Sequence, residues 1–157
     1  MCGIAGFFSL EPVAPQTPER MLDVLRRRGP DAQHSVLWDS RFERTQGAAC
    51  NALLHARLSI IDPRPQADQP MSNEAGDIWI CYNGEVYDWV GPAAELKAQG
   101  YSFRNRSDTE FILHAYEAWG IDCLARLRGM FAFTILDLRR RTAWLVRDRM
   151  GLKPLVY

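Results

Sequence analysis

A cysteine directly follows the initiator methionine, at the start of the segment MCGIAGFF. Removal of Met1 would leave Cys2 with a thiol and a free α-amine on the same residue. A thiol ordinarily has a pKa of about 8.5 and an α-amine one of about 7.7 to 8.0, so the neutral amine can accept the thiol proton, directly or through one water. Cys2 is therefore a candidate nucleophile that carries its own base. The alternative is a small buried hydrophobic residue that happens to be second in the chain.

A nucleophile that attacks an acyl group also needs hydrogen-bond donors where negative charge develops. The Asn83-Gly84 dipeptide offers an amide side chain and an unhindered backbone N–H. The same dipeptide is a strong signal for a two-residue hairpin turn. Both interpretations stay open from these residues alone.

Three charged side chains stand where they could bind a substrate or serve the fold. Arg57 lies in the otherwise apolar HARLS stretch, where a buried guanidinium needs a carboxylate partner from the protein or from a ligand. Asp108 and Glu110 follow Ser107 with the spacing of a capping box at a helix start. The two acids either stabilise that helix or contribute to an anionic site.

The composition is that of an ordinary globular domain of 157 residues, long enough to bury a core without disulfides. The 19 basic side chains balance 19 acidic ones, so no overall field favours nucleic acid or an anionic membrane. The arginine runs at 26–28 and 139–141 are interpreted as solvated helix ends or turns.

The 4 cysteines and 3 histidines show no CxxC or HxxxH spacing, so we expect neither a metal site nor a cofactor. Cysteines this sparse do not indicate a disulfide scaffold, and we expect reduced thiols and a cytoplasmic location. The N-terminus lacks the basic region of a signal peptide, and no apolar run is long enough to span a bilayer. The sequence thus predicts neither a nucleic-acid nor a membrane partner.

Strands near both ends of the chain and helices in the middle predict an α+β domain in which helices cover sheets. Ser107 is expected to cap a central helix, and Thr17 an earlier one that runs to about Arg28. Prolines and glycines predict loops at 11–18 and 62–77. The expected strands are 2–8, 34–38, 47–55, 58–61, 78–82, 85–87, 130–138, 143–147 and 155–157, and the other expected helices are 92–99 and 121–127.

Seven segments follow one another in the order that they have in one enzyme family. They are MCGIAGFF, RRRGPDA, HARLSIIDPRPQADQPM, YNGEVYD, SDTEFILHAYEAWG, MFAFTILDLRRRTAWLVRD and RMGLKPLVY. Together they resemble the glutaminase domain of class II glutamine amidotransferases. The RLSIID, QPM and SDTE segments make the asparagine synthetase branch the most similar, and the resemblance covers nearly the whole chain.

The resemblance implies an N-terminal nucleophile hydrolase fold. This is a four-layer αββα sandwich of two antiparallel sheets, here expected to be shortened at the C-terminus. Residues 1–157 would form a single amidotransferase domain without a synthetase or acceptor domain. The chain would then be either a free-standing subunit that passes ammonia to a separate synthetase or transferase, or a truncated remnant.

The resemblance also implies the chemistry of the site. Cys2 would be the nucleophile, with its own α-amine as the base, and Asn83 and Gly84 would form the oxyanion hole. The thiol would attack the side-chain amide of glutamine and release ammonia. Water would then hydrolyse the γ-glutamyl thioester.

Glutamine binding would fall to one cation and two anions, which suits a zwitterion. Arg57 would hold the α-carboxylate, because its planar fork favours two-point recognition. Glu85 and Asp108 would bind the ammonium group. The loop that closes over the substrate would include Gln69, Pro70 and Met71.

Two residues depart from the family pattern. Arg27 stands where histidine usually precedes the Arg-Gly-Pro-Asp motif, and Asp88 replaces an asparagine, which would add negative charge near the site. A strand at 155–157 at the end of a sheet would leave an unpaired edge. We therefore expect a homodimer or an obligate partner that covers this edge.

Two other functions stay open. A catalytically silent module could retain the pocket and bind glutamine or stabilise a synthetase, as the short C-terminus suggests. Hydrolysis of a different amide is the second, but Arg57, Glu85 and Asp108 argue against it. A substrate that is not a zwitterion would leave buried charges unpaired.

Overall fold

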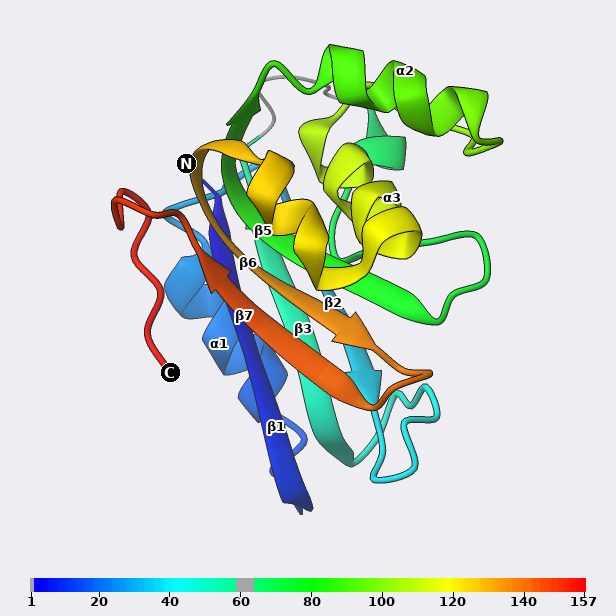
Figure 1. The fold of residues 1–157 in the computed structure, drawn as a ribbon. Coiled ribbons are helices and arrows are strands. Elements are labelled where there is room, and N and C mark those ends of the chain that lie inside the picture. The colour runs from blue at the N-terminus through cyan, green and yellow to red at the C-terminus, as the bar shows by residue number, and fades with distance from the viewer. Residues whose placement is uncertain (1, 59–63) are drawn as a thin grey trace.

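Two antiparallel sheets pack face to face in the computed structural model, which describes residues 2–58 and 64–157 (Figure 1). The strand order is β1-β3-β2 in the first sheet and β4-β5-β6-β7 in the second. The first sheet contains β1 (Gly3–Val13), β2 (Ala32–Trp38) and β3 (Ala49–Arg57). The second contains β4 (Met71–Ser72), β5 (Ile78–Tyr87), β6 (Arg128–Asp137) and β7 (Thr142–Arg147).

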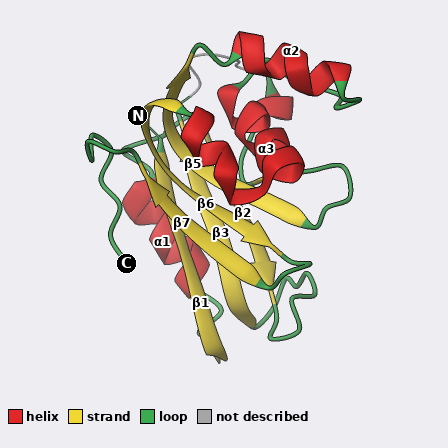
Figure 2. Cartoon of the chain, in the orientation of Figure 1, coloured by secondary structure: helices red, strands yellow, loops and turns green. Residues whose placement is uncertain are grey.

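Helices cover the outer faces of the two sheets (Figure 2). Helix α1 packs on the first sheet, α3 packs on β5, and α2 packs on α3. This is the four-layer sandwich that the resemblance implied. The helices are α1 (Thr17–Leu25), α2 (Val90–Ala98) and α3 (Asp108–Trp119), with two short 3-10 helices, η1 (Pro65–Ala67) and η2 (Gly120–Arg126). Among the residues described, no helix is long and apolar enough to cross a bilayer.

The alternation of side chains along β5 decides which layer each residue faces. Trp79 and Cys81 pack with Leu53 of the first sheet, in the core between the sheets. Tyr82 belongs to the second core, under α2 and α3. Asn83 therefore faces the first sheet, at the end where β1 begins and β3 finishes.

The expected hairpin at Asn83-Gly84 is wrong. Strand β5 runs through both residues without interruption and pairs along its whole length with β6. The chain reaches β6 only after α2, α3 and η2, so no tight turn joins the two strands. Ten consecutive residue pairs between β5 and β6 outweigh the local turn preference of an Asn-Gly dipeptide.

Two boundaries near the N-terminus also differ from expectation. Strand β1 extends into the expected loop at 11–18, because Val13 pairs with Ala49 beyond an irregularity in the register. Helix α1 finishes at Leu25 instead of continuing to about Arg28.

The two expected helix caps have different outcomes. Ser107 caps α3 as expected, since its hydroxyl accepts a hydrogen bond from the amide of Glu110 at 3.3 Å. Thr17 does not cap α1 but is its first residue, and the cap position is taken by Gln16.

The expected strand at 155–157 does not form. These residues have no regular structure, and Val156 and Tyr157 are exposed. The second sheet instead finishes at β7, which is its edge strand in place of 155–157, and a homodimer or an obligate partner stays a prediction of the sequence alone. Residues 59–61 of the expected strand at 58–61 lie outside the described residues, and the described part of the loop at 62–77 contains η1 and β4.

Candidate active site

A cavity of about 200 Å³ opens where the two sheets meet the N-terminal end of α3. It gathers residues from both sheets, from the segment after η1 and from α3. Pro70 and Met71 are not among its lining residues, because the chain enters β4 there and Met71 packs into the core. The predicted site residues that line it are Cys2, Arg57, Gln69, Asn83, Gly84, Glu85 and Asp108.

Cys2 lies immediately before β1, in contact with the end of β3. The amide of Leu58 donates to its Sγ at 3.4 Å, and the Arg28 guanidinium donates to its backbone carbonyl at 3.2 Å. A Cβ on Gly29 would lie 2.2 Å from the carbonyl oxygen of Ala56, so only glycine allows this turn to approach β3. The Arg-Gly-Pro-Asp motif therefore helps to hold Cys2 at the start of β1, beside the end of β3.

Arg57 has a protein partner that the sequence did not identify. Its Nη1 donates to the carboxylate of Asp68 and to the carbonyl of Arg64, at 3.1 Å in the second case. The second oxygen of Asp68 lies 3.1 Å from Nε2 of His34 on β2. Asp68 belongs to the segment that was expected to cover the substrate. The guanidinium is thereby oriented within the cavity wall, since its planar fork is fixed from one side.

Tyr82 connects the first sheet to α3 through three polar contacts. Its amide donates to Oε1 of Gln69 at 2.6 Å, and its carbonyl accepts from Nε2 of His55 at 3.1 Å. Its hydroxyl donates to Oδ2 of Asp108 at 2.5 Å. Tyr82 directly precedes Asn83, so these contacts also fix the position of the candidate oxyanion donors.

His55 is fully buried and neutral in this network. Burial lowers its pKa to about 4, although the hydrogen bond with Tyr82 acts in the opposite direction. The proton therefore lies on Nε2, which faces a carbonyl, and Nδ1 has no hydrogen-bond partner among the described residues. His55 thus positions β5 and is unsuited to act as a general base at neutral pH.

Asp108 is a carboxylate in a desolvated position. Burial raises its pKa, while hydrogen bonds from the Tyr82 hydroxyl and the Val86 amide oppose that rise. Both of these donors bind Oδ2. Because a buried anion needs compensation, the side chain is suited to a cationic group of a ligand in the cavity.

The residues that line the cavity come from nearly the whole length of the chain, from Cys2 to Lys153. One family model also covers this whole length. A model described as a glutamine amidotransferase domain matches residues 1–157. The chain belongs to this family.

Curated relatives of this amidotransferase domain include synthetases. Asparagine synthetase [glutamine-hydrolyzing] 3 of Bacillus subtilis is 37% identical over all of the chain and 25% of its own length. Amidase chry2 of Gibberella zeae is also 37% identical, over all of the chain and 24% of its own length. The domain therefore spans about a quarter of the length of these relatives.

Solved structures support the fold of the domain. The glutamine phosphoribosylpyrophosphate amidotransferase of B. subtilis superimposes with a TM-score of 0.80 at 23% identity, over 98% of this chain and 38% of that one. At this level of identity the likeness concerns the fold alone. It agrees with the expected N-terminal nucleophile hydrolase architecture of two antiparallel sheets with helices.

Lys153 is a cavity residue of the amidotransferase domain that the sequence reasoning missed. It is buried and lines the same cavity as Cys2. Its amide donates to Asp148, whose carboxylate also accepts the amides of Phe131, Met150 and Leu152. In the sequence, Asp148 followed by Gly151 and Lys153 after a strand indicates a tight loop that can place a side chain.

Asp88 lies outside the cavity, and the described residues include no candidate metal site. Asp88, which replaces the usual asparagine, lies beyond β5 at a φ of 55° and is not among the cavity residues. Asp and Asn tolerate this backbone conformation better than most residues. In residues 2–58 and 64–157, no group of three or more His, Cys, Asp or Glu side chains could hold a metal ion.

Replacement of Gly84 by alanine is expected to destabilise the domain by about 1–3 kcal/mol. A Cβ at this position would lie 2.3 Å from the carbonyl oxygen of Met130 and 2.6 Å from the Cα of Phe131. Strands β5 and β6 would have to separate beside the candidate oxyanion donors. Urea unfolding measures the loss, and Gly91→Ala is the control because a Cβ there would meet no atom within 4 Å beyond its chain neighbours and the backbone of its own helix. Equal stability of the two variants would contradict the prediction.

As the pH falls, Tyr82→Phe is expected to lose substrate binding at a higher pH than the wild type does. The Tyr82 hydroxyl lowers the pKa of Asp108, so its loss raises that pKa further above the ordinary value. As the pH falls, the carboxyl group then becomes neutral earlier, and a bound cation loses its counter-charge. The measurement is KM for glutamine between pH 4.5 and 8.

Tyr116→Phe provides the control for this pH experiment. Tyr116 also donates to a buried aspartate, Asp137, at 3.1 Å, at the other end of α3 and outside the cavity lining. Its pH profile should follow that of the wild type. A profile of Tyr82→Phe that is unchanged, or displaced to lower pH, would show that the hydroxyl does not support the charge of Asp108.

Proposed function

We propose that the domain hydrolyses the side-chain amide of glutamine, with Cys2 as the nucleophile. The observation that carries the proposal is the common cavity of a thiol, a guanidinium and a carboxylate, each from a different part of the fold. Cys2 precedes β1, Arg57 terminates β3 and Asp108 begins α3. Glutamine offers an amide for the first group, a carboxylate for the second and an ammonium group for the third.

The proposed reaction requires that Met1 has been removed beforehand, so that Cys2 carries a free α-amine. The neutral α-amine of Cys2 takes the thiol proton, and the sulfur attacks the amide carbon of the substrate. Asn83 and Gly84 donate to the oxyanion that forms, and the amine returns the proton to the leaving nitrogen. Ammonia departs, and water hydrolyses the γ-glutamyl thioester to glutamate and free thiol.

The α-carboxylate and the ammonium group of glutamine bind to fixed charges of the domain. Arg57, which lines the cavity and is oriented by Asp68, binds the α-carboxylate. Asp108 and Glu85 bind the ammonium group. Gln69 closes this end of the cavity, because its side chain joins Tyr82 to Thr109 by hydrogen bonds of 2.6 and 3.2 Å.

The ammonia is proposed to serve a synthetase or transferase reaction in the cytoplasm. This extension is supported by relatives named as glutamine-hydrolysing asparagine synthetases, of which the chain spans about a quarter. Addition of candidate partner proteins should increase ammonia transfer to the acceptor over ammonia release to solvent.

Glutamine turnover tests the proposal. Intact-mass measurement first establishes that Met1 is absent, and glutamate and ammonia are then quantified after incubation with glutamine between pH 6 and 9. Equal amounts of both products are expected. A trimmed protein that binds glutamine in calorimetry but releases no ammonia would refute catalysis and favour the silent binding module.

A further inference from the structure

Glu110 is a fully buried carboxylate that the proposed mechanism does not use. It lies in the first turn of α3, two residues after Asp108. Its Oε1 accepts from the amide and from Nε of Arg104, at 2.9 and 3.2 Å, and its Oε2 accepts from the amide of Asn105 at 2.9 Å. The carboxylate therefore fixes both the backbone and one side chain of the segment before the helix.

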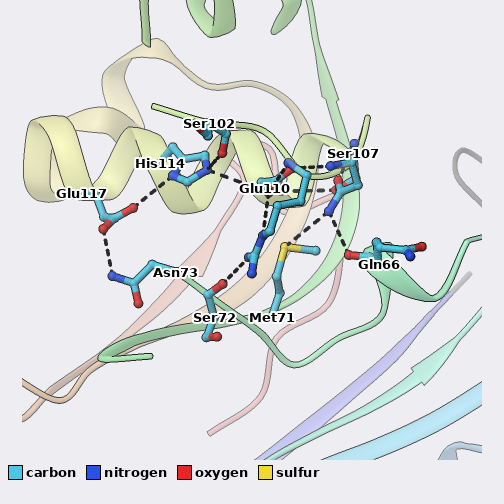
Figure 3. Close-up of polar contacts among 11 residues, drawn as sticks. Gln66, Met71, Ser72, Asn73, Ser102, Ser107, Glu110, His114 and Glu117 are labelled. Atoms are coloured by element: carbon cyan, nitrogen blue, oxygen red, sulfur yellow. Dashed lines mark hydrogen bonds and ion pairs between the residues drawn. The ribbon is translucent and has the colours of Figure 1, made fainter. Parts of the chain in front are cut away.

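The side chains of Arg104 and Asn105 extend from this anchor to another part of the chain. Nη2 of Arg104 donates to the carbonyl of Ser72 at 2.6 Å, and Nδ2 of Asn105 donates to the carbonyl of Gln66 at 2.9 Å. Figure 3 shows these contacts between the region of Glu110 and the segment that carries Gln66 and Ser72. Both acceptors are backbone carbonyls, so the contacts fix the path of the chain itself.

A third contact joins the next residue, Asn73, to α3. Nδ2 of Asn73 donates to Oε1 of Glu117 at 2.8 Å, and Oε2 of Glu117 lies 3.0 Å from Nδ1 of His114 (Figure 3). Like Glu110, Glu117 and His114 belong to α3. Helix α3 and the residues just before it thus hold both ends of the segment at 66–73.

The residues between the two clamped carbonyls are those that serve the cavity. Ala67 and Gln69 line it, and Asp68 binds the guanidinium of Arg57. A displacement of this short segment would therefore alter three features of the site together. Misplacement of binding groups by about 1 Å is enough to reduce catalysis substantially.

We propose that Arg104 and Asn105, anchored by Glu110, are positioning residues that clamp the segment at 66–72 against α3 for substrate binding. The inference rests on the proposed glutaminase function. The clamped segment serves the amino acid end of glutamine through Arg57 and Gln69. Loosening the clamp therefore weakens binding of the substrate more than it slows the attack by Cys2.

Arg104→Met tests the clamp at a side chain that is 45% exposed, while buried Glu110 keeps its hydrogen bonds to the amides of residues 104 and 105. The variant loses the donor to Ser72, and Lys at the same position retains one. Arg126→Met is the matched control, since Arg126 is 46% exposed and also pairs with a glutamate, Glu95, outside the cavity lining. We expect an increase of about tenfold in KM for Arg104→Met, with kcat within about threefold of the wild type.

Hydrogen exchange provides a readout that does not depend on turnover. Without glutamine, the amides of Ala67, Asp68 and Ser72 should exchange at least about fivefold faster in Arg104→Met than in the wild type or Arg126→Met. Arg104→Lys should recover part of both effects. Unchanged exchange, or faster exchange with an unchanged KM, would overturn the inference. A wild type that releases no ammonia would refute the glutaminase proposal, while the exchange rates would still decide whether Arg104 holds the segment.

Discussion

Replacement of Cys2 by alanine is expected to reduce the rate of ammonia release from glutamine at least about 10⁴-fold. The variant has no atom at residue 2 that can form the thioester, so only uncatalysed attack by water remains. The cavity and the charged groups that bind the substrate are unchanged, and glutamine should still bind. The measurements are kcat from coupled ammonia detection and Kd from calorimetry.

Cys123→Ala is the control for this experiment. Burial raises the pKa of Cys123 to about 12, so its thiol stays protonated at neutral pH and cannot act as a nucleophile. It packs in the core under α2 and α3 and is not among the cavity residues. This variant should lose stability and retain turnover. More than about 1% of wild-type turnover in Cys2→Ala would show that another group performs the attack.

Part of the site was predictable because three of its residues lie at the start or end of a regular element. Cys2 precedes the first strand, Arg57 lies at the end of another, and Asp108 follows a helix cap. Apolar patterning and capping residues locate such positions within a few residues. The seven segments, which occur in the order of the family, then predicted that these ends of elements lie together at one site.

The contacts that orient those residues were not predictable in the same way. Asp68 binds Arg57 from 11 positions away, and Tyr82 binds Asp108 across 26. Such pairs depend on how the sheets and α3 come together, which local propensity does not encode. Sequence patterns therefore predicted candidate groups that line one cavity, but not the side chains that hold them.

Asn83-Gly84 and Glu110 show the limits of local rules. The dipeptide has a strong turn preference, but β6 pairs with both of its residues and keeps them in a strand. Ser107 caps α3 as the capping box predicts, but the carboxylate of Glu110 binds the amides of Arg104 and Asn105. In both cases the local signal marked an important position, and tertiary contacts decided its role.

Replacement of Asp108 by asparagine is expected to lower kcat/KM for glutamine about 10²- to 10³-fold. Asparagine has nearly the same shape and can still accept from the Tyr82 hydroxyl and the Val86 amide, so the fold should be retained. The substrate ammonium, however, would lose the buried one of its two proposed counter-charges and keep only the carboxylate of Glu85. Removal of one partner from a buried ion pair costs about 3–5 kcal/mol, and the lower part of this range corresponds to the predicted loss.

The control for this charge removal is Asp23→Asn. Asp23 also lies on a helix and pairs with an arginine, Arg26, at 2.7 Å, but both side chains are more than half exposed. Surface ion pairs of this kind contribute about 0–1 kcal/mol, so turnover should be unchanged. Steady-state kinetics at pH 7.5 should show the loss in Asp108→Asn as an increase in KM. If Asp108→Asn retained wild-type kcat/KM, the ammonium group would have to bind elsewhere, and the proposed orientation of glutamine in the cavity would be wrong.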